Sequence, residues 1–152
     1  MICIRLDFKI VAITGDGGIQ MNIQELQTIA REKIPIKIIV MNNKALGMIR
    51  HFQEMYFDSN YYGTIEGYSV PDFIKISEAY GIKALRISDI SEINDLREKL
   101  NDGDSYLIEV ELKNITYVIP KLGMGRPIED QEPLIDRAEL KENMIIDMYK
   151  AY

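Results

Sequence analysis

The chain has 152 residues, of which 47% are hydrophobic and 28% are charged, and its net charge is −6. These values are typical of a globular domain that can bury a hydrophobic core. The acidic balance argues against a nucleic-acid surface, because phosphate binding requires clustered Lys and Arg. Apolar runs such as residues 38–41 are far shorter than the roughly 20 residues that span a bilayer. We therefore expect no nucleic-acid partner and no membrane partner.

The amino terminus and the cysteine content bear on localisation. Residues 1–7 lack the basic region and long apolar stretch of a signal peptide. Cys3 is the only cysteine, so the chain forms no internal disulfide and fits a reducing compartment. We expect a cytoplasmic protein in which Cys3 acts as a small hydrophobic residue.

Strands and helices are expected to alternate along the first two thirds of the chain. Residues 9–14 and 36–41 are apolar runs without polar alternation, as in strands that are buried on both faces. Between them, apolar residues fall mostly on one helical face, and Pro35 closes this region. The apolar positions of this face are Met21, Ile23, Leu26, Ile29 and Ala30.

The same alternation continues after the second strand. The pattern predicts a helix at 46–57, a loop at 59–68, a helix at 71–80, a strand at 82–87, a helix at 91–100 with Ser91 as its N-cap, and a strand at 105–112. Such an alternation predicts a three-layer α/β fold, in which a parallel sheet carries helices on both faces.

The pattern changes after Leu112. Residues 119–133 contain three prolines and two glycines, which indicates an extended arm. A last helix is expected at 136–149. We therefore predict a first domain at residues 1–118 and a carboxy-terminal arm and helix at 119–152.

Two strand ends carry residues that suit an anionic ligand. The first strand ends in Gly15-Asp16-Gly17-Gly18, and the second ends in Asn42-Asn43. Because ligands bind beyond the carboxyl ends of parallel strands, both segments are expected to open on the same edge. The glycines permit close approach of the backbone, and the positive end of the following helix points to the same place.

Asp16 and Asn43 offer the oxygen donors that Mg²⁺ prefers, and a backbone carbonyl after Asn43 could supply one more. Each segment alone is also typical of an ordinary turn. Their joint occurrence at two strand ends predicts a site for Mg²⁺ and a diphosphate.

Several short motifs resemble the thiamine-diphosphate fingerprint of the acetolactate synthase family. They are Gly15-Asp16-Gly17, Glu25-Leu26-Gln27-Thr28, Asn42-Asn43 and Gly47-Met48, followed by Pro71-Asp72-Phe73 and Ala79-Tyr80-Gly81. The separation of 27 residues between Asp16 and Asn43 is also similar to that of the family. The resemblance extends over residues 9–120 and implies a thiamine-diphosphate-binding domain of the PP type.

Carried over to this chain, the resemblance makes the side chains of Asp16 and Asn43 and the carbonyl of Ala45 the Mg²⁺ ligands. It places the diphosphate on the main chain at Gly17 and Gly18. The remaining positions implied to contact the cofactor are Gly15, Met21, Gly47 and Met48, although a methionine at position 21 is equally compatible with core packing.

The resemblance also implies a substrate channel lined by Met48 and Phe52. Acetolactate synthases usually carry tryptophan at the second position, so Phe52 leaves the acceptor substrate open. In the family, a glutamate from a separate amino-terminal domain activates the cofactor's aminopyrimidine across a subunit interface. Glu25 lies after the diphosphate segment and is not equivalent to that glutamate, so no catalytic residue is assigned.

The family's domain also begins earlier than this chain does. Only about eight residues precede the first strand, and Leu6 stands where a proline is usual. We therefore expect a domain that is partly truncated at its amino terminus, with exposed apolar surface. We also expect a homo- or hetero-oligomer in which another chain or segment supplies the pyrimidine-binding domain.

The implied activity is decarboxylation of a 2-keto acid followed by transfer of the two-carbon unit. Two alternatives stay open: a 2-keto acid decarboxylase or other carboligase subunit, and a non-catalytic binding module or truncated remnant. His51 is the only histidine and has no nucleophile or carboxylate at a suitable spacing. We expect it to be a surface or channel-facing residue rather than a general base.

Overall fold

The structure is a computed structural model that describes residues 2–6, 9–113 and 117–149, with side chains from Ile10 onward. The expectation for the Cys3 side chain therefore lies outside the described residues. The chain separates into two compact units, Met1–Thr116 and Tyr117–Tyr152. Within the described part of the chain, no helix has both the length and the apolar character needed to cross a membrane.

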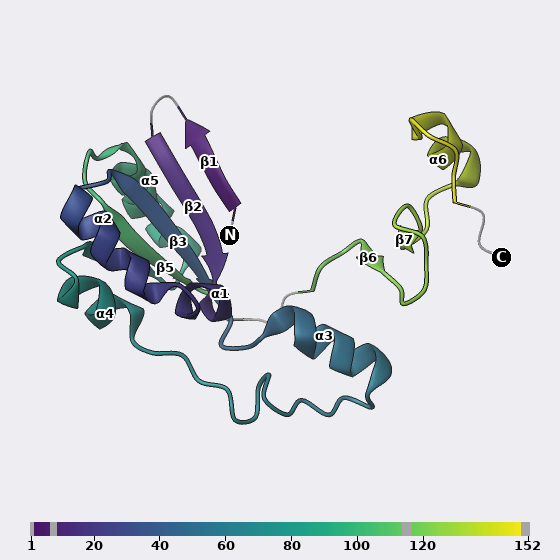
Figure 1. Cartoon of the computed structure of the whole chain (residues 1–152), viewed down its shortest axis with the longest axis horizontal. Helices are drawn as coiled ribbons and strands as arrows, with labels where there is room; N and C mark the ends of the chain where they lie inside the picture. Colours follow the sequence, from purple (N-terminus) through teal and green to yellow (C-terminus); the bar gives the residue numbers. More distant parts are fainter. Residues whose placement is uncertain (1, 7–8, 114–116, 150–152) are drawn as a thin grey trace. The chain divides into compact units, whose positions relative to one another are not determined.

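A five-stranded sheet forms the centre of the first unit. In spatial order its strands are β1 (Ile2–Leu6), β2 (Lys9–Gly15), β3 (Ile36–Asn42), β5 (Tyr106–Glu111) and β4 (Lys83–Ile87). The last four are parallel, which confirms the predicted α/β class, and β1 adds an antiparallel edge strand beside β2 (Figure 1). Nothing in residues 2–6 predicted this edge strand, because five residues are too few to show a period.

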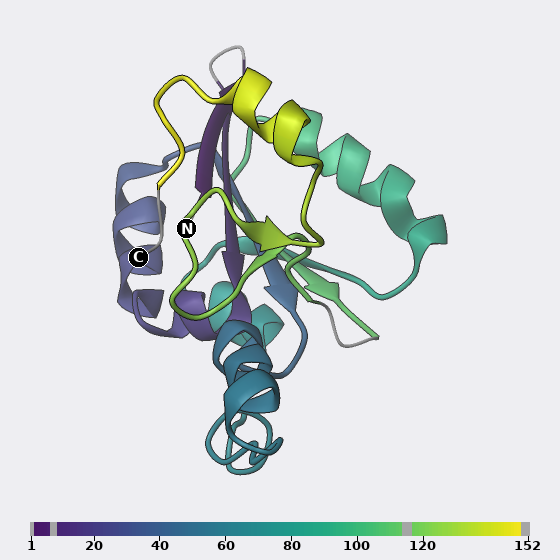
Figure 2. The same ribbon diagram turned by 90° about the vertical axis from the view of Figure 1, so that its right-hand side faces the viewer.

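Helices cover both faces of this sheet. The helices α1 (Asp16–Gln20), α2 (Leu26–Glu32) and α4 (Phe73–Ala79) pack on one face, and α5 (Ile93–Asn101) packs on the other (Figure 2). The helix α3 (Gly47–Tyr56) follows β3 and extends beyond the carboxyl ends of the strands (Figure 1). The three-layer arrangement is therefore as predicted.

The hydrophobic core is divided between the two faces. The cluster on the first face contains Ile19, Leu26, Ile38, Val40, Phe73, Ile82 and Leu107. The cluster on the second face contains Ile87, Tyr106 and Ile108, with Leu96 of α5 packed against it. Fully burying one such side chain contributes about 1.5–3 kcal/mol, so the helices are held mainly by these contacts.

Two predictions for the segment after β2 differ from the structure. The segment Gly15–Gly18 is not a loop, because α1 begins at Asp16 directly after β2. The expected helix over 21–30 is broken into a turn, a short 3-10 helix η1 (Ile23–Glu25) and α2. Its apolar positions Ile23, Leu26 and Ile29 still face the core, because packing rather than helix continuity places them there.

The start of α5 also differs from the prediction. A 3-10 turn, η2 (Ile90–Glu92), precedes the helix, and the capping side chain is that of Asp89, the N-cap of η2, rather than that of Ser91. The Asp89 carboxylate accepts from the backbone N–H of Ser91, while Glu92 accepts from the backbone N–H of Asp89, which forms a capping box.

The second unit contains little regular structure. Two short strands, β6 (Lys121–Leu122) and β7 (Gln131–Glu132), pair within the predicted arm. The helix α6 (Arg137–Asn143) is shorter than the predicted 136–149, because the backbone is already extended at Met144. Asp136 caps its amino terminus through Ala138 and Glu139.

Candidate functional site

The site forms where β2 and β3 end side by side. These strands are parallel, and Gly15 at the end of β2 lies opposite Met41 of β3. Asp16 therefore begins α1 at the same sheet edge at which Asn43 follows β3 (Figure 1). The turn predicted at Asn42-Asn43 begins one residue later, because Asn42 is still the last residue of β3.

Asp16 is a buried carboxylate that is only partly satisfied. Its side chain is 3% exposed, and Oδ1 accepts a hydrogen bond of 3.0 Å from the backbone N–H of Gly17. Oδ2 is buried and has no hydrogen-bond partner among the described residues. Burial raises the pKa of Asp16 above its usual value, and nearby backbone N–H groups, that of Gly17 first, offset this only in part. An unsatisfied buried carboxylate oxygen is costly, and a bound cation would relieve that cost.

The segment after β3 faces this carboxylate. Backbone N–H groups of Lys44 and Ala45 lie close enough to Asp16 to influence its pKa. Asn43 is half-buried, and its Oδ1 accepts from the backbone N–H of Ala45 at 3.1 Å, while Lys44 has a left-handed φ of 55°. The fold thus brings together Asp16, Asn43 and Ala45, which the sequence placed in one predicted metal site.

The glycines of the motif are explained mainly by close packing within the protein. A Cβ atom on Gly17 would lie 2.6 Å from Cδ2 of Leu46, and one on Gly18 would lie 2.7 Å from Oγ1 of Thr14. A Cβ on Gly47 would lie 3.0 Å from the Asn43 amide nitrogen, whereas Gly15 has open space around it. Glycine at 17 and 18 therefore lets the segments around Asp16 approach one another.

Tyr68 joins the site from a distant loop, and the sequence pattern does not predict this. Its hydroxyl accepts a hydrogen bond of 3.1 Å from Nε2 of Gln20, which also donates to the backbone carbonyl of Asp16 at 3.2 Å. Burial, reinforced by the negative charge of Asp16, raises the pKa of Tyr68. Tyr68 is 48 residues away from Gln20, so no local spacing signals the contact.

The predicted cofactor and channel side chains are exposed. Met21 is 78% exposed, so its alternative role in core packing is wrong. Met48 and Phe52 lie one turn apart on α3 and are 66% and 41% exposed. The Phe52 ring packs against Tyr56, with 4.8 Å between ring centroids. These side chains offer an apolar surface at the strand-end edge rather than a closed channel.

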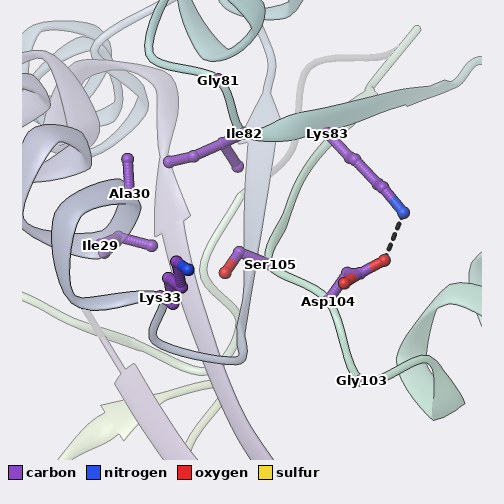
Figure 3. Close-up of a pocket in the computed structure, with 9 residues that line it drawn as sticks. All are labelled: Ile29, Ala30, Lys33, Gly81, Ile82, Lys83, Gly103, Asp104 and Ser105. Carbon is purple, nitrogen blue, oxygen red and sulfur yellow. Dashed lines mark hydrogen bonds and ion pairs between the residues drawn. The ribbon is translucent and has the colours of Figure 1, made fainter.

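A separate pocket of about 230 Å³ lies at the opposite edge, where β4 and β5 begin. Lys33, Gly81 and Ser105 contribute to its walls, and Lys83 pairs with Asp104 beside it (Figure 3). None of the predicted site residues lines this pocket.

The fold and the candidate site at the ends of β2 and β3 define a class of protein: an α/β domain with a largely parallel sheet and candidate ligand-binding residues at the carboxyl ends of two adjacent strands. The family model for the C-terminal TPP binding domain of thiamine pyrophosphate enzymes matches residues 3–110. The chain therefore belongs to this family of thiamine-diphosphate-binding domains, which confirms the resemblance seen in its motifs.

Curated relatives are acetolactate synthase large subunits. The probable large subunit of Methanococcus aeolicus is 44% identical over 104 residues, which cover 68% of this chain and 17% of that protein. The isozyme 2 large subunit of Escherichia coli (strain K12) is 36% identical over 120 residues, which cover 76% of this chain and 22% of that protein. The chain thus spans about a fifth of the length of these relatives.

The fold is also similar to a solved thiamine diphosphate-dependent 4-hydroxybenzoylformate decarboxylase from Rhodococcus jostii RHA1. The TM-score is 0.61 and the identity is 28%, and the match covers 69% of this chain and 20% of that one.

Proposed function

We propose that this chain binds thiamine diphosphate through Mg²⁺ at the carboxyl ends of β2 and β3, as the cofactor-binding part of an acetolactate synthase-like enzyme. The observation that carries the proposal is the buried Asp16 Oδ2, which lacks a partner among the described residues and faces the Asn43–Ala45 segment. Mg²⁺ takes oxygen ligands and keeps phosphate oxygens in its shell, so this donor set suits a metal diphosphate.

Each predicted residue has a distinct role in this proposal. The Asp16 carboxylate supplies the charged metal ligand, and the Asn43 side chain and Ala45 carbonyl supply neutral ones. The main chain at Gly17 and Gly18 holds the diphosphate, with Gly15 and Gly47 shaping the backbone on either side of the metal. The exposed Met21 and Met48 contact the cofactor, and Met48 and Phe52 line the approach of the substrate.

Thiamine diphosphate, when bound, supplies the electron sink for decarboxylation of a 2-keto acid. This chain's residues hold and orient the cofactor, while the activating glutamate comes from a pyrimidine-binding domain on another chain or segment. The active assembly is therefore a homo- or hetero-oligomer in the cytoplasm. It decarboxylates a 2-keto acid and transfers the two-carbon unit.

Two observations favour a second candidate, a simple 2-keto acid decarboxylase. The chain resembles a solved 4-hydroxybenzoylformate decarboxylase, and it carries Phe52 where acetolactate synthases usually carry tryptophan. A non-catalytic module that binds only Mg²⁺ and the diphosphate is the candidate from another class. The activating glutamate distinguishes the non-catalytic module from the two enzymes, because a chain that no partner supplies with this glutamate can only bind the cofactor.

The proposal is tested by calorimetric titration of the purified chain with thiamine diphosphate, with and without Mg²⁺. We expect binding that requires Mg²⁺ and that is abolished by Asp16→Ala, since this change removes the charged ligand. Glu25→Ala is the matched control, because Glu25 is an exposed carboxylate outside the site. Binding that survives Asp16→Ala would remove the metal assignment.

A further inference from the structure

A hydrogen-bonded chain of polar side chains lies directly behind the segment that carries Asn43. Asn42 and Glu109 are each 2% exposed, and Nδ2 of Asn42 donates to Oε1 of Glu109 at 2.6 Å. The second carboxylate oxygen of Glu109 accepts from Nε of Arg86 at 2.9 Å. Arg86 lies directly across from Glu109 in the β4–β5 pair and also reaches Asp72 at 3.4 Å.

This series of hydrogen bonds determines which way the Asn42 amide points. Oδ1 of Asn42 accepts from the backbone N–H of Lys44 at 3.0 Å, while Nδ2 faces Glu109. A flipped amide would set its oxygen against the carboxylate and its NH₂ against the Lys44 N–H, so both contacts would become repulsive. Because the Glu109 carboxylate can only accept, it fixes the Asn42 oxygen toward Lys44.

The orientation of this amide is transmitted to the segment beside Asp16. Lys44 has the left-handed φ of 55°, which is unfavourable for a residue with a Cβ and persists when neighbouring contacts hold it. The hydrogen bond from Lys44 to Asn42 is such a contact. With Lys44 held, the backbone of Lys44 and Ala45 stays close to Asp16, and Asn43 Oδ1 accepts from the Ala45 N–H.

We infer that Asn42 and Glu109 are positioning residues for the metal site: the buried carboxylate orients the Asn42 amide, and this amide holds the Lys44 backbone that sets Asn43 and Ala45. The inference rests on the proposed function, because it assigns these two residues a task at the same site. Stability alone does not require them, since apolar residues of similar size commonly replace a buried ionic group without loss of stability.

An exchange of the two side chains tests the inference. Asn42→Asp places two carboxylates against each other. In Glu109→Gln, the new amide oxygen accepts from Arg86 and the new NH₂ faces Asn42. The Asn42 amide is then expected to flip, so that its oxygen accepts from this NH₂. The double variant Asn42→Asp/Glu109→Gln restores the contacts with the donor reversed: Gln donates to Asp, whose other oxygen accepts from Lys44. Glu98→Gln is the matched control, because Glu98 is an exposed carboxylate of α5 and takes no part in these hydrogen bonds.

The first measurement is hydrogen exchange of the Lys44 amide in the metal-free full chain, followed by NMR. We expect each single variant to raise the exchange rate about tenfold, as for a lost hydrogen bond, and the double variant to return it to the original value. The second measurement is the Mg²⁺ concentration needed for thiamine diphosphate binding. We expect this to rise about 10- to 100-fold in the single variants and to recover in the double variant.

An unchanged hydrogen-exchange rate of the Lys44 amide in both single variants would overturn this inference but not the proposed function. A changed exchange rate with an unchanged Mg²⁺ requirement would do the same. Single variants that lose affinity without recovery in the double variant would also overturn it, because that result marks a general packing defect. An original chain without Mg²⁺-dependent binding would overturn the proposed function, and with it the metal role of the pair.

Discussion

The metal-binding role proposed for Asp16 comes at the expense of stability. Its carboxylate is buried, and one oxygen has no partner among the described residues. Burial makes the charged form unfavourable and raises the pKa of Asp16, so the metal-free chain carries a penalty at neutral pH. The same unsatisfied oxygen makes the position suitable for a cation.

We expect Asp16→Asn to raise the free energy of unfolding of the metal-free chain at pH 7 by about 1 kcal/mol, while it abolishes Mg²⁺ binding. A carboxyl with a raised pKa in the folded state destabilises that state above this pKa, and the effect disappears as the pH falls through it. Urea unfolding at pH 7 and at acid pH should therefore show a gain that shrinks on acidification. A variant less stable than the original at pH 7 would contradict this account.

A larger residue at Gly17 would have to displace neighbouring side chains, that of Leu46 above all. We expect Gly17→Ala to lower the free energy of unfolding by about 1–3 kcal/mol, because its Cβ would overlap Leu46 Cδ2. Gly15→Ala is the control, since a Cβ there meets nothing within 4 Å and φ is −83°. Equal losses in the two variants, measured by urea unfolding, would show that the packing explanation is wrong.

At the scale of elements, long apolar runs were easier to predict than helix boundaries. The strands β2 and β3 match their predicted runs within one residue, because burial on both faces leaves little freedom of composition. A single helix is predicted from residue 91, whereas the 3-10 turn η2 begins at Ile90 and α5 begins at Ile93, because the Asp89 carboxylate rather than Ser91 supplies the cap. Local composition alone does not decide between two adjacent caps.

We expect Asp89→Ala to lower the free energy of unfolding by about 1 kcal/mol, because it leaves the first N–H groups of η2 without their acceptor. Ser91→Ala should have a smaller effect, since Ser91 donates to Asp89 and does not cap the turn itself. Thermal unfolding followed by circular dichroism checks both variants. A larger loss in Ser91→Ala would restore Ser91 as the cap.

At the scale of the whole molecule, the two units differ in how much core they contain. The first unit has a buried cluster on each face of its sheet, whereas Leu140 is the buried hydrophobic residue described in the second unit. The hydrogen bonds described for Asp16, Asn43 and Tyr68 join residues of the first unit. Stability of the site is therefore expected to follow the core of that unit.

We expect Leu107→Ala to lower the free energy of unfolding of the first unit by about 2–5 kcal/mol, because Leu107 is fully buried in its larger cluster. Leu140→Ala, a buried leucine in the second unit, is the control. Hydrogen exchange of amides in β3 and β5 should accelerate in the first variant and stay unchanged in the second. Acceleration in both would show that the units unfold together.

The sequence by itself determined the α/β class, the parallel strand pair and the placement of Asp16 and Asn43 at one edge. These follow from hydrophobic period and from the rule that parallel strands end together. Only the tertiary structure decided that Asp16 is buried, that Tyr68 joins the site through Gln20, and that Glu109 orients Asn42 from 67 residues away. Such contacts depend on which side chains meet across packed elements, and no local pattern encodes them.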